Sequence, residues 1–512
     1  MAEQIIRGRV GKSARNFAYG MLMQVTTLVL NFVVRTVFIK YLNIEYLGIN
    51  GLFSNILTVL SLAELGFGTA MVYSMYKPLA QNDETKLQAL MNLYKKVYSI
   101  IGLIVAMLGL SVIPLFDFII KEAPDIKENL TLIYLLFLGN SVSSYYFAYK
   151  RSILNADQKS YICSQYRFGF IILKALLQIL VLVLWGNFIA YLLIQIAATI
   201  GENIAISYYV NRHYPYLREK NSQKLDNSEL TRIRKDVYAL ILSKISHVAI
   251  NGTANIIITA VAGVIWVGLY SNYCMITGAV IMILSQIADA VRGSVGNFVA
   301  TESQESHRVL FRRLDFMNFW LYGFATIALI TLFNPFIEIW LGAQYTLNKA
   351  CVIVIALNFM LEGFLNSLWI FRTTMGLFTQ GKYRPVIAAS INIILSIILG
   401  HKLGILGVLL GTTFSRLLVN TWYDPYIIFK HGLGLKPWKY YCEYISRVII
   451  MAICCILLFV INTAISNIPK IPQFLIMMIC TALIPNIVFY IIYHKKEECT
   501  YLTAQLQRLI HK

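Results

Sequence analysis

Charge is the scarcest property of this sequence. Only 13% of its 512 residues are Asp, Glu, Lys or Arg, whereas 58% are hydrophobic and the mean hydropathy is +0.65. This composition excludes a soluble globular protein, because a soluble core could not bury so much apolar side chain. Backbone polar groups inside lipid must be satisfied locally, which favours helices. The sequence therefore predicts an all-α integral membrane protein with many spans.

Motifs of enzymes and of cofactor sites are also missing. The sequence contains no GxxxxGK[ST] phosphate loop, no DxD and no HExxH. The expected outer loops are too short for a glycan polymerase or ligase. Eight cysteines are scattered, and the adjacent Cys454 and Cys455 lie within an apolar run where they form neither a CxxC motif nor a zinc ligand set. We expect no enzyme activity, no cofactor and no bound metal.

Hydrophobic windows of about 20 residues predict about 14 transmembrane helices. Their centres lie near Leu28, Leu60, Val105, Leu136, Leu176, Ala197, Ile250, Ala279, Ala325, Ala356, Leu395, Leu410, Leu457 and Leu483. Residues 1–15 hold four basic residues without an apolar core, so no cleavable signal is evident and the N-terminus is expected to stay in the cytoplasm.

The basic residues support this topology. The formal net charge is +19, but the Lys and Arg residues lie in short loops, which argues against nucleic-acid binding. Of 44 Lys and Arg residues, 33 fall on the side of the N-terminus and 6 on the other side. By the positive-inside rule, both termini are expected in the cytoplasm.

An internal repeat is indicated at an offset of 220 residues. The segment 33–73 reads as two hydrophobic helices joined by a short polar turn, and the segment from Val261 to Gly293 has the same design. The offset aligns Gly48 with Gly268. We therefore expect a six-helix bundle at 1–210, a basic cytoplasmic linker at 211–236, a second six-helix bundle at 237–430, and helices 13 and 14 with a cytoplasmic tail at 431–512. Two halves that enter the membrane in the same direction are related by an axis along the membrane normal.

Charges at membrane depth are the candidate functional residues. They are Arg35, Glu64, Lys174, Glu202, Lys244, His247, Asp289, Arg292, Glu362 and Arg416. Arg292, Glu362 and Arg416 are expected near helix ends, where a side chain can snorkel to the headgroups. Arg35 either snorkels or binds an anion in a cavity. Glu64 forms a buried pair or couples transport to an ion, and His247 is expected to be a packing residue.

The chain resembles the polysaccharide-transporter branch of the multidrug/oligosaccharidyl-lipid/polysaccharide exporter superfamily, which includes O-antigen, capsule and teichoic-acid flippases. The resemblance is carried by the 6+6+2 plan of spans, by VVRTVFIKYLNIEYLG, which contains Arg35, and by SLAELGFGTAMVY, which contains Glu64. The second segment is similar to helix 2 of the related lipid II flippase. This sequence lacks the basic residues before that glutamate, which argues against lipid II as the substrate.

The resemblance implies a flippase that moves a polyprenyl-(di)phosphate-linked oligosaccharide to the outer leaflet of the bacterial cytoplasmic membrane. Its partners would be that lipid-linked oligosaccharide, membrane lipids and glycan-assembly proteins. Arg35 and Lys244 suit the phosphates, and Tyr270, Asn272 and Tyr273 suit the sugars. Glu64, Asp289, Lys174 and Glu202 would provide cavity charge or coupling to H+ or Na+. The alternative is a multidrug exporter of amphipathic cations, which predicts more carboxylates than cations at mid-membrane.

Overall fold

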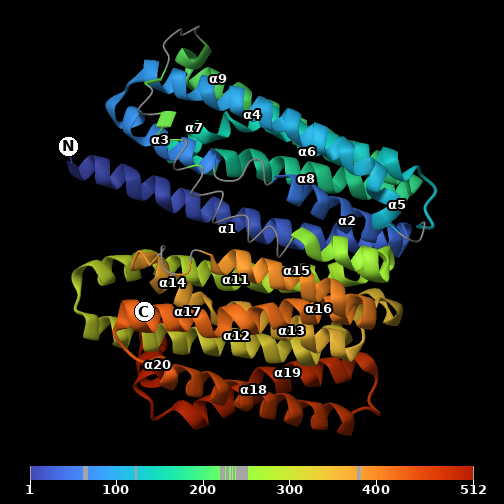
Figure 1. Cartoon of the computed structure of the whole chain (residues 1–512), viewed down its shortest axis with the longest axis vertical. Helices are drawn as coiled ribbons and strands as arrows, with labels where there is room; N and C mark the ends of the chain where they lie inside the picture. The colour runs from blue at the N-terminus through green and yellow to red at the C-terminus, as the bar shows by residue number, and fades with distance from the viewer. Residues whose placement is uncertain are drawn as a thin grey trace. The chain divides into compact units, whose positions relative to one another are not determined.

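The computed structural model describes residues 2–510, except 62–66, 121–123, 219–224, 227–229, 232, 234–236, 238–251, 378–380 and 382. The side chain of Asp289 also lies outside the described part. Every regular element in the described ranges is helical, as expected for an all-α membrane protein. The chain divides into two compact units, Met1–Gly268 and Leu269–Lys512 (Figure 1). The predicted bundle boundaries stay a prediction, because most of the expected linker and of residues 237–251 is outside the described part.

The first unit consists of long helices and their connections. In chain order they are α1 (Ala2–Tyr41), α2 (Ile44–Leu60), α3 (Phe67–Gln81), α4 (Glu84–Val112), η2 (Ile113–Leu115), α5 (Phe116–Ile119), α6 (Leu130–Ala148), α7 (Arg151–Ala156), α8 (Ser160–Trp185), α9 (Phe188–His213) and η3 (Pro215–Arg218). A further helix covers Gly252–Ala262. Helix α1 packs along α8, and α8 packs against α9.

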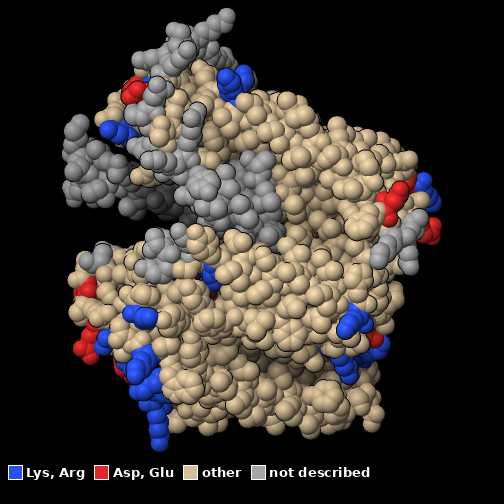
Figure 2. All heavy atoms as spheres, in the orientation of Figure 1, with Lys and Arg blue, Asp and Glu red and all other residues tan. Residues whose placement is uncertain are grey.

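The second unit begins within α11 (Val264–Thr301). It continues with α12 (Gln304–Leu341), η4 (Ala343–Tyr345), α13 (Lys349–Phe364), α14 (Asn366–Thr374), α15 (Arg384–Leu403), α16 (Ile405–Ser415), η5 (Arg416–Asn420), α17 (Thr421–Ile427), η6 (Ile428–Leu433), α18 (Trp438–Ala464), α19 (Lys470–Tyr493) and α20 (Glu497–Ile510). The segments η5 and η6 are π-helical turns. Charged side chains of this unit gather toward the two ends of its helices, and the flank between them carries few (Figure 2).

The predicted spans agree with the described helices. Eleven of these helices are long and apolar enough to cross a membrane, and each contains one of the predicted centres. The span predicted near Leu136 corresponds to α6. The span predicted near Leu60 is formed by two shorter helices, α2 and α3, on either side of residues 62–66. The centre near Ile250 lies outside the described residues.

Local sequence explains the sharp turns at the helix ends. Helix α1 ends at Tyr41, and the Asn43 side chain then accepts hydrogen bonds from the N–H groups of Glu45 and Tyr46, which starts α2. Gly186 ends α8 with a φ of +56°, and Asn187 caps α9. These caps let hydrophobic helices reverse direction within two residues. The turn expected inside 33–73 is confirmed.

Two glycines allow a reciprocal close contact inside the first unit. A Cβ on Gly48 would lie 2.1 Å from the carbonyl oxygen of Val264, and a Cβ on Gly268 would lie 2.6 Å from the carbonyl oxygen of Ile44. Val264 follows Ile44 by 220 residues, and Gly268 follows Gly48 by the same offset. Gly48 therefore accommodates Val264, which lies one helix turn before Gly268. In the same way, Gly268 accommodates Ile44, which lies one helix turn before Gly48. A two-fold relation between these two segments produces such an exchange of contacts.

We expect Gly48→Leu to lower the free energy of unfolding by about 3 kcal/mol, the upper end of the cost of overpacking, because the obstacle is main chain. The measurement is denaturant unfolding of the purified protein in detergent. Gly139→Leu is the matched control, since a Cβ at Gly139 in α6 meets nothing within 4 Å. Equal losses in the two variants would contradict the close-contact explanation.

Candidate functional site

A group of cations surrounds one carboxylate at membrane depth in the first unit. Arg151, at the start of α7, donates to Glu202 of α9 at 2.7 Å and to the side-chain oxygen of Asn203 at 2.8 Å. Lys174 of α8 lies within electrostatic range of both Arg167 and Glu202. We call Arg151, Arg167, Lys174 and Glu202 the α8 cluster. It holds three positive charges and one negative charge, an excess that suits an anionic ligand.

Helix geometry places the α8 cluster along the membrane normal. Arg167 and Lys174 are seven residues apart on α8, so they share a face and differ in depth by about 10 Å. Lys174 precedes the end of α8 at Trp185 by 11 residues, or about 16 Å. Lys174 therefore lies near the middle of α8, whereas Arg167 lies seven residues, or about 10 Å, from the start of this helix at Ser160. The predicted cavity charges Lys174 and Glu202 are brought together here.

Arg35 occupies a shallower position. It precedes the end of α1 at Tyr41 by six residues, or about 9 Å. The side chain is half-buried and acts electrostatically on Tyr191. Tyr191 packs with Phe38 and Phe188, with ring centroids 5.4 and 6.0 Å away. Because α1 packs along α8, Arg167, Lys174 and Arg35 form a series of cations at three depths in one unit.

The second unit carries an ion pair at membrane depth. Arg416 donates to Glu362 at 2.8 Å and also to the main-chain oxygen of Asn358. Arg416 follows the start of α16 by 11 residues, about 16 Å, and begins the π-helical turn η5. The side chain of Glu362 is 52% exposed, whereas that of Arg416 is 12% exposed. The ion pair gives each side chain a partner within the second unit, and the expectation of snorkelling for Arg416 and Glu362 stays a prediction.

Tyr270 belongs to the same part of the second unit. It lies in α11, is half-buried, and interacts electrostatically with Arg416 and Glu362. Asn272 and Tyr273 are fully buried instead. The Tyr273 hydroxyl donates to Asn334 and accepts from the N–H of Leu347 at 2.8 Å. Of the three residues predicted to contact sugars, Tyr270 thus lies near the exposed carboxylate of Glu362. The hydroxyl of Tyr273 is instead hydrogen-bonded within the protein.

Several predicted site residues cannot be placed. Glu64, Lys244 and His247 lie outside the described residues, as does the side chain of Asp289. Arg292 is described and exposed on α11. In the described part of the chain, no group of three or more His, Cys, Asp or Glu side chains is arranged to hold a metal ion.

Buried ion pairs connect helices of the second unit. Asp424 of α17 accepts from Arg372 of α14 at 3.2 Å and from Arg384 of α15. Asp315 of α12 accepts from Arg447 of α18 at 2.5 Å and from Ser367 at 2.8 Å.

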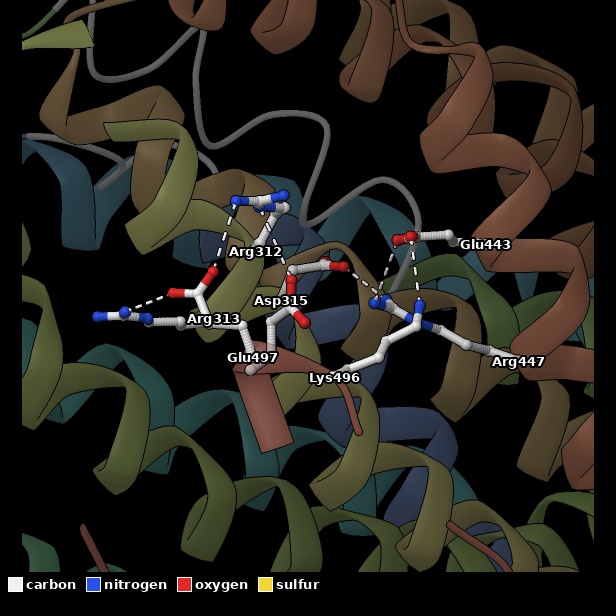
Figure 3. A network of polar contacts seen from close by, with 8 residues as sticks. Arg312, Arg313, Asp315, Glu443, Arg447, Lys496 and Glu497 are labelled. Atoms are coloured by element: carbon white, nitrogen blue, oxygen red, sulfur yellow. Dashed lines mark hydrogen bonds and ion pairs between the residues drawn. The ribbon is translucent and has the colours of Figure 1, made fainter. Parts of the chain in front are cut away.

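The Asp315–Arg447 pair belongs to a larger polar network. In Figure 3, Arg447 points toward both Asp315 and Glu443, and Glu497 of α20 reaches the arginines of α12. These contacts join distant segments of the chain, so we infer that they stabilise the second unit.

The sequence reasoning missed Arg151 and Arg167. Both lie between the spans predicted near Leu136 and Leu176, so from sequence alone they belong to a loop. The spacing of seven residues between Arg167 and Lys174 is the signal that could have joined them on one helix face. Arg151 carried no comparable signal, since its partner Glu202 is 51 residues away.

The chain matches one sequence family and several solved structures. A sequence family described as "Polysaccharide biosynthesis protein" matches residues 13–292. No curated protein sequence matches the chain. Among solved structures, the chain is similar to the lipid II flippase MurJ in an inward closed conformation, with a TM-score of 0.65 and 16% identity over 94% of this chain and 98% of that chain.

Two multidrug transporters are also similar in fold. An inward-facing MATE family transporter of the MOP superfamily gives a TM-score of 0.59 and 14% identity, covering 80% of this chain and 99% of that chain. A variant of the Vibrio cholerae MATE transporter VcmN gives 0.57 and 13%, covering 83% and 99%. At these identities the likeness concerns the fold alone, which is the MurJ and MATE type of multi-pass helical fold.

Proposed function

Because the chain belongs to the family described as polysaccharide biosynthesis protein, we propose that it is a membrane transporter, a flippase for a polyprenyl-(di)phosphate-linked oligosaccharide. It would move this lipid from the inner to the outer leaflet of the bacterial cytoplasmic membrane, with both chain termini in the cytoplasm. The observation that carries the proposal is the α8 cluster, with its excess of cations at membrane depth.

The main energetic barrier to flipping is the transfer of the polar headgroup across the hydrocarbon layer. Phosphates and sugar hydroxyls lose their hydration in hydrocarbon, at a cost that only charged and polar partners can offset. Arg167 and Lys174 lie two helix turns apart and can receive a diphosphate successively as it moves along α8. Arg35, closer to the other end of the unit, would take the next position, and Arg151 holds Glu202 so that this carboxylate does not neutralise Lys174 fully.

The remaining site assignments are extensions of this proposal. Lys244 would add a cation, and Tyr270 would contact the sugars. The two six-helix bundles at 1–210 and 237–430 would alternate access to the two leaflets. Glu64 or Asp289 would couple this movement to H+ or Na+. Glycan-assembly proteins would supply the substrate and remove the product.

The test is a flipping assay in proteoliposomes. One lipid carries an oligosaccharide on a polyprenyl diphosphate, and the matched control lipid carries the same sugars on the same polyprenol without phosphate. We expect flipping of the first and at least about 10-fold slower flipping of the second, because each charge-assisted hydrogen bond to phosphate contributes about 1.5–3 kcal/mol. Equal rates for the two lipids would contradict the role of the cations.

A multidrug exporter is the second candidate, and one observation favours it. Glu362 presents a carboxylate that is 52% exposed at membrane depth beside Tyr270, as a site for organic cations requires. The same proteoliposomes, loaded with a fluorescent organic cation and given a proton gradient, distinguish the two functions. Cation export without lipid flipping would replace the flippase proposal with this one.

A further inference from the structure

A cavity of about 560 Å³ opens in the second unit where α12 and α18 begin. Its wall is formed by α12, the segment between η6 and α18, the first turns of α18, and α20. Phe311, Phe316, Phe429, Leu433 and Tyr440 give it an apolar interior. Charged side chains also line it, so the cavity is amphipathic. A volume of this size is typical of sites for small ligands.

The lining of the cavity carries an excess of positive charge. Three of the four lining carboxylates are already in ion pairs: Asp315 with Arg447 at 2.5 Å, Glu443 with Lys496 at 3.5 Å, and Glu498 with Arg312 at 3.7 Å. Arg308, Lys436 and Lys439 also line the cavity, together with one remaining carboxylate, Glu305. These three cations and one carboxylate leave an excess of two positive charges in the lining.

Two further features point to an anionic ligand. Helix α18 starts at Trp438 after Pro437, which makes no side-chain cap hydrogen bond, so the first N–H groups of a 27-residue helix are directed to this end. Arg447, which lines the cavity, is only 7% exposed. Its Nε has no hydrogen-bond partner in the described part of the chain, although its other nitrogens contact Asp315 and Glu443 (Figure 3).

The residue types at the start of α18 place the cavity at the level of the lipid headgroups. Trp438, Lys439 and Tyr440 are the first three residues of the span α18, and Trp438 is 73% exposed. Tryptophan and lysine at the end of a span are typical of the headgroup region. Arg447 follows Trp438 by nine residues, so the cavity extends about 14 Å along α18 toward the bilayer interior.

We propose that this cavity binds the phosphate headgroup of an anionic phospholipid from the adjacent leaflet. Lys436, Lys439 and the start of α18 would contact the phosphate, and the aromatic and aliphatic side chains of the lining would receive the upper part of the acyl chains. The site is separate from the α8 cluster and does not depend on the proposed flipping activity. The bound lipid would hold α18 and α20 at a leaflet that contains anionic phospholipids.

The test is native mass spectrometry of the full chain released from nanodiscs that contain phosphatidylglycerol and phosphatidylcholine. We expect wild-type protein to retain phosphatidylglycerol selectively. Lys436→Gln/Lys439→Gln should bind it about 30-fold more weakly, because each basic residue at a membrane surface contributes roughly a factor of five. Lys95→Gln/Lys96→Gln removes two exposed cations from α4 and is the matched control, which should bind as wild type does.

Three results would overturn the proposal. One is equal retention in wild type and in the Lys436/Lys439 variant, both shown to be folded by an unchanged melting temperature. Another is equal loss in the Lys95/Lys96 control, which would mean general surface attraction. The third is displacement of the lipid by millimolar inorganic phosphate at constant ionic strength, which would assign the cavity to a soluble phosphate instead. Trp438→Ala provides a second variant, with weaker retention expected because the headgroup loses its aromatic neighbour.

Discussion

Replacing Asp424 by alanine is expected to lower the free energy of unfolding by about 3–5 kcal/mol. Asp424 is 2% exposed and is the shared acceptor for Arg372 and Arg384, which are also buried. The substitution would leave two guanidinium groups inside the second unit without their carboxylate. The cost is high because a buried charge that has lost its partner keeps its desolvation penalty and loses the compensating attraction.

Thermal and denaturant unfolding in detergent would measure this loss. Glu338→Gln is the control for charge alone, because the Glu338–Lys470 pair is solvent-exposed and should contribute no more than about 1 kcal/mol. If Asp424→Ala unfolds as wild type does, the ion pairs of Asp424 with Arg372 and Arg384 do not stabilise the second unit.

A triple variant separates lost charge from lost packing. Asp424→Leu combined with Arg372→Met and Arg384→Met removes all three charges and keeps side chains of similar length. Replacing a buried ionic group completely by apolar residues is often neutral or stabilising. We therefore expect this triple variant to recover most of the stability that Asp424→Ala loses. A triple variant as unstable as the single one would show that packing around Asp424, and not charge, determines the effect.

The helical architecture could be predicted from sequence because hydrophobic length is a local property. Asn43 and Gly186 also mark their turns within a few residues, so the α1–α2 and α8–α9 connections follow from the chain itself. Helix α2 is different. Its hydrophobic run continues past Leu60, and the predicted span includes residues 62–66, which lie outside the described part between α2 and α3.

The candidate site was predicted less completely, because its contacts join distant segments. Lys174 and Glu202 stood out as charges within apolar runs, and they lie near each other. Arg151 did not, since its side chain reaches Glu202 from a short helix outside the apolar runs. Arg416 and Glu362 are 54 residues apart and look terminal in sequence, whereas a π-helical turn and a helix pairing place them together. Sequence periodicity describes neighbouring residues on one helix, so it cannot predict an ion pair between residues 50 or more positions apart.

Neutralising the α8 cluster should abolish most lipid flipping. We expect Arg167→Gln/Lys174→Gln to reduce the rate at least about 100-fold, because each position would lose a charge-assisted hydrogen bond to phosphate of about 1.5–3 kcal/mol. The assay is flipping of the diphosphate-linked oligosaccharide in proteoliposomes with matched protein content. Lys95→Gln/Lys96→Gln removes the same charge from exposed positions of the same unit and should flip at the wild-type rate.

Two further variants show whether the effect is electrostatic recognition. Lys174→Arg keeps the positive charge and should retain most of the activity, whereas Lys174→Gln should lose about 10-fold. Glu202→Gln removes the single carboxylate of the cluster and raises its positive charge, so we expect tighter binding of the diphosphate and slower release. The saturating rate should then fall while the apparent affinity rises. If Glu202→Gln instead weakens binding, Glu202 serves mainly to hold Arg151 in place, and the cluster depends on that ion pair for its geometry.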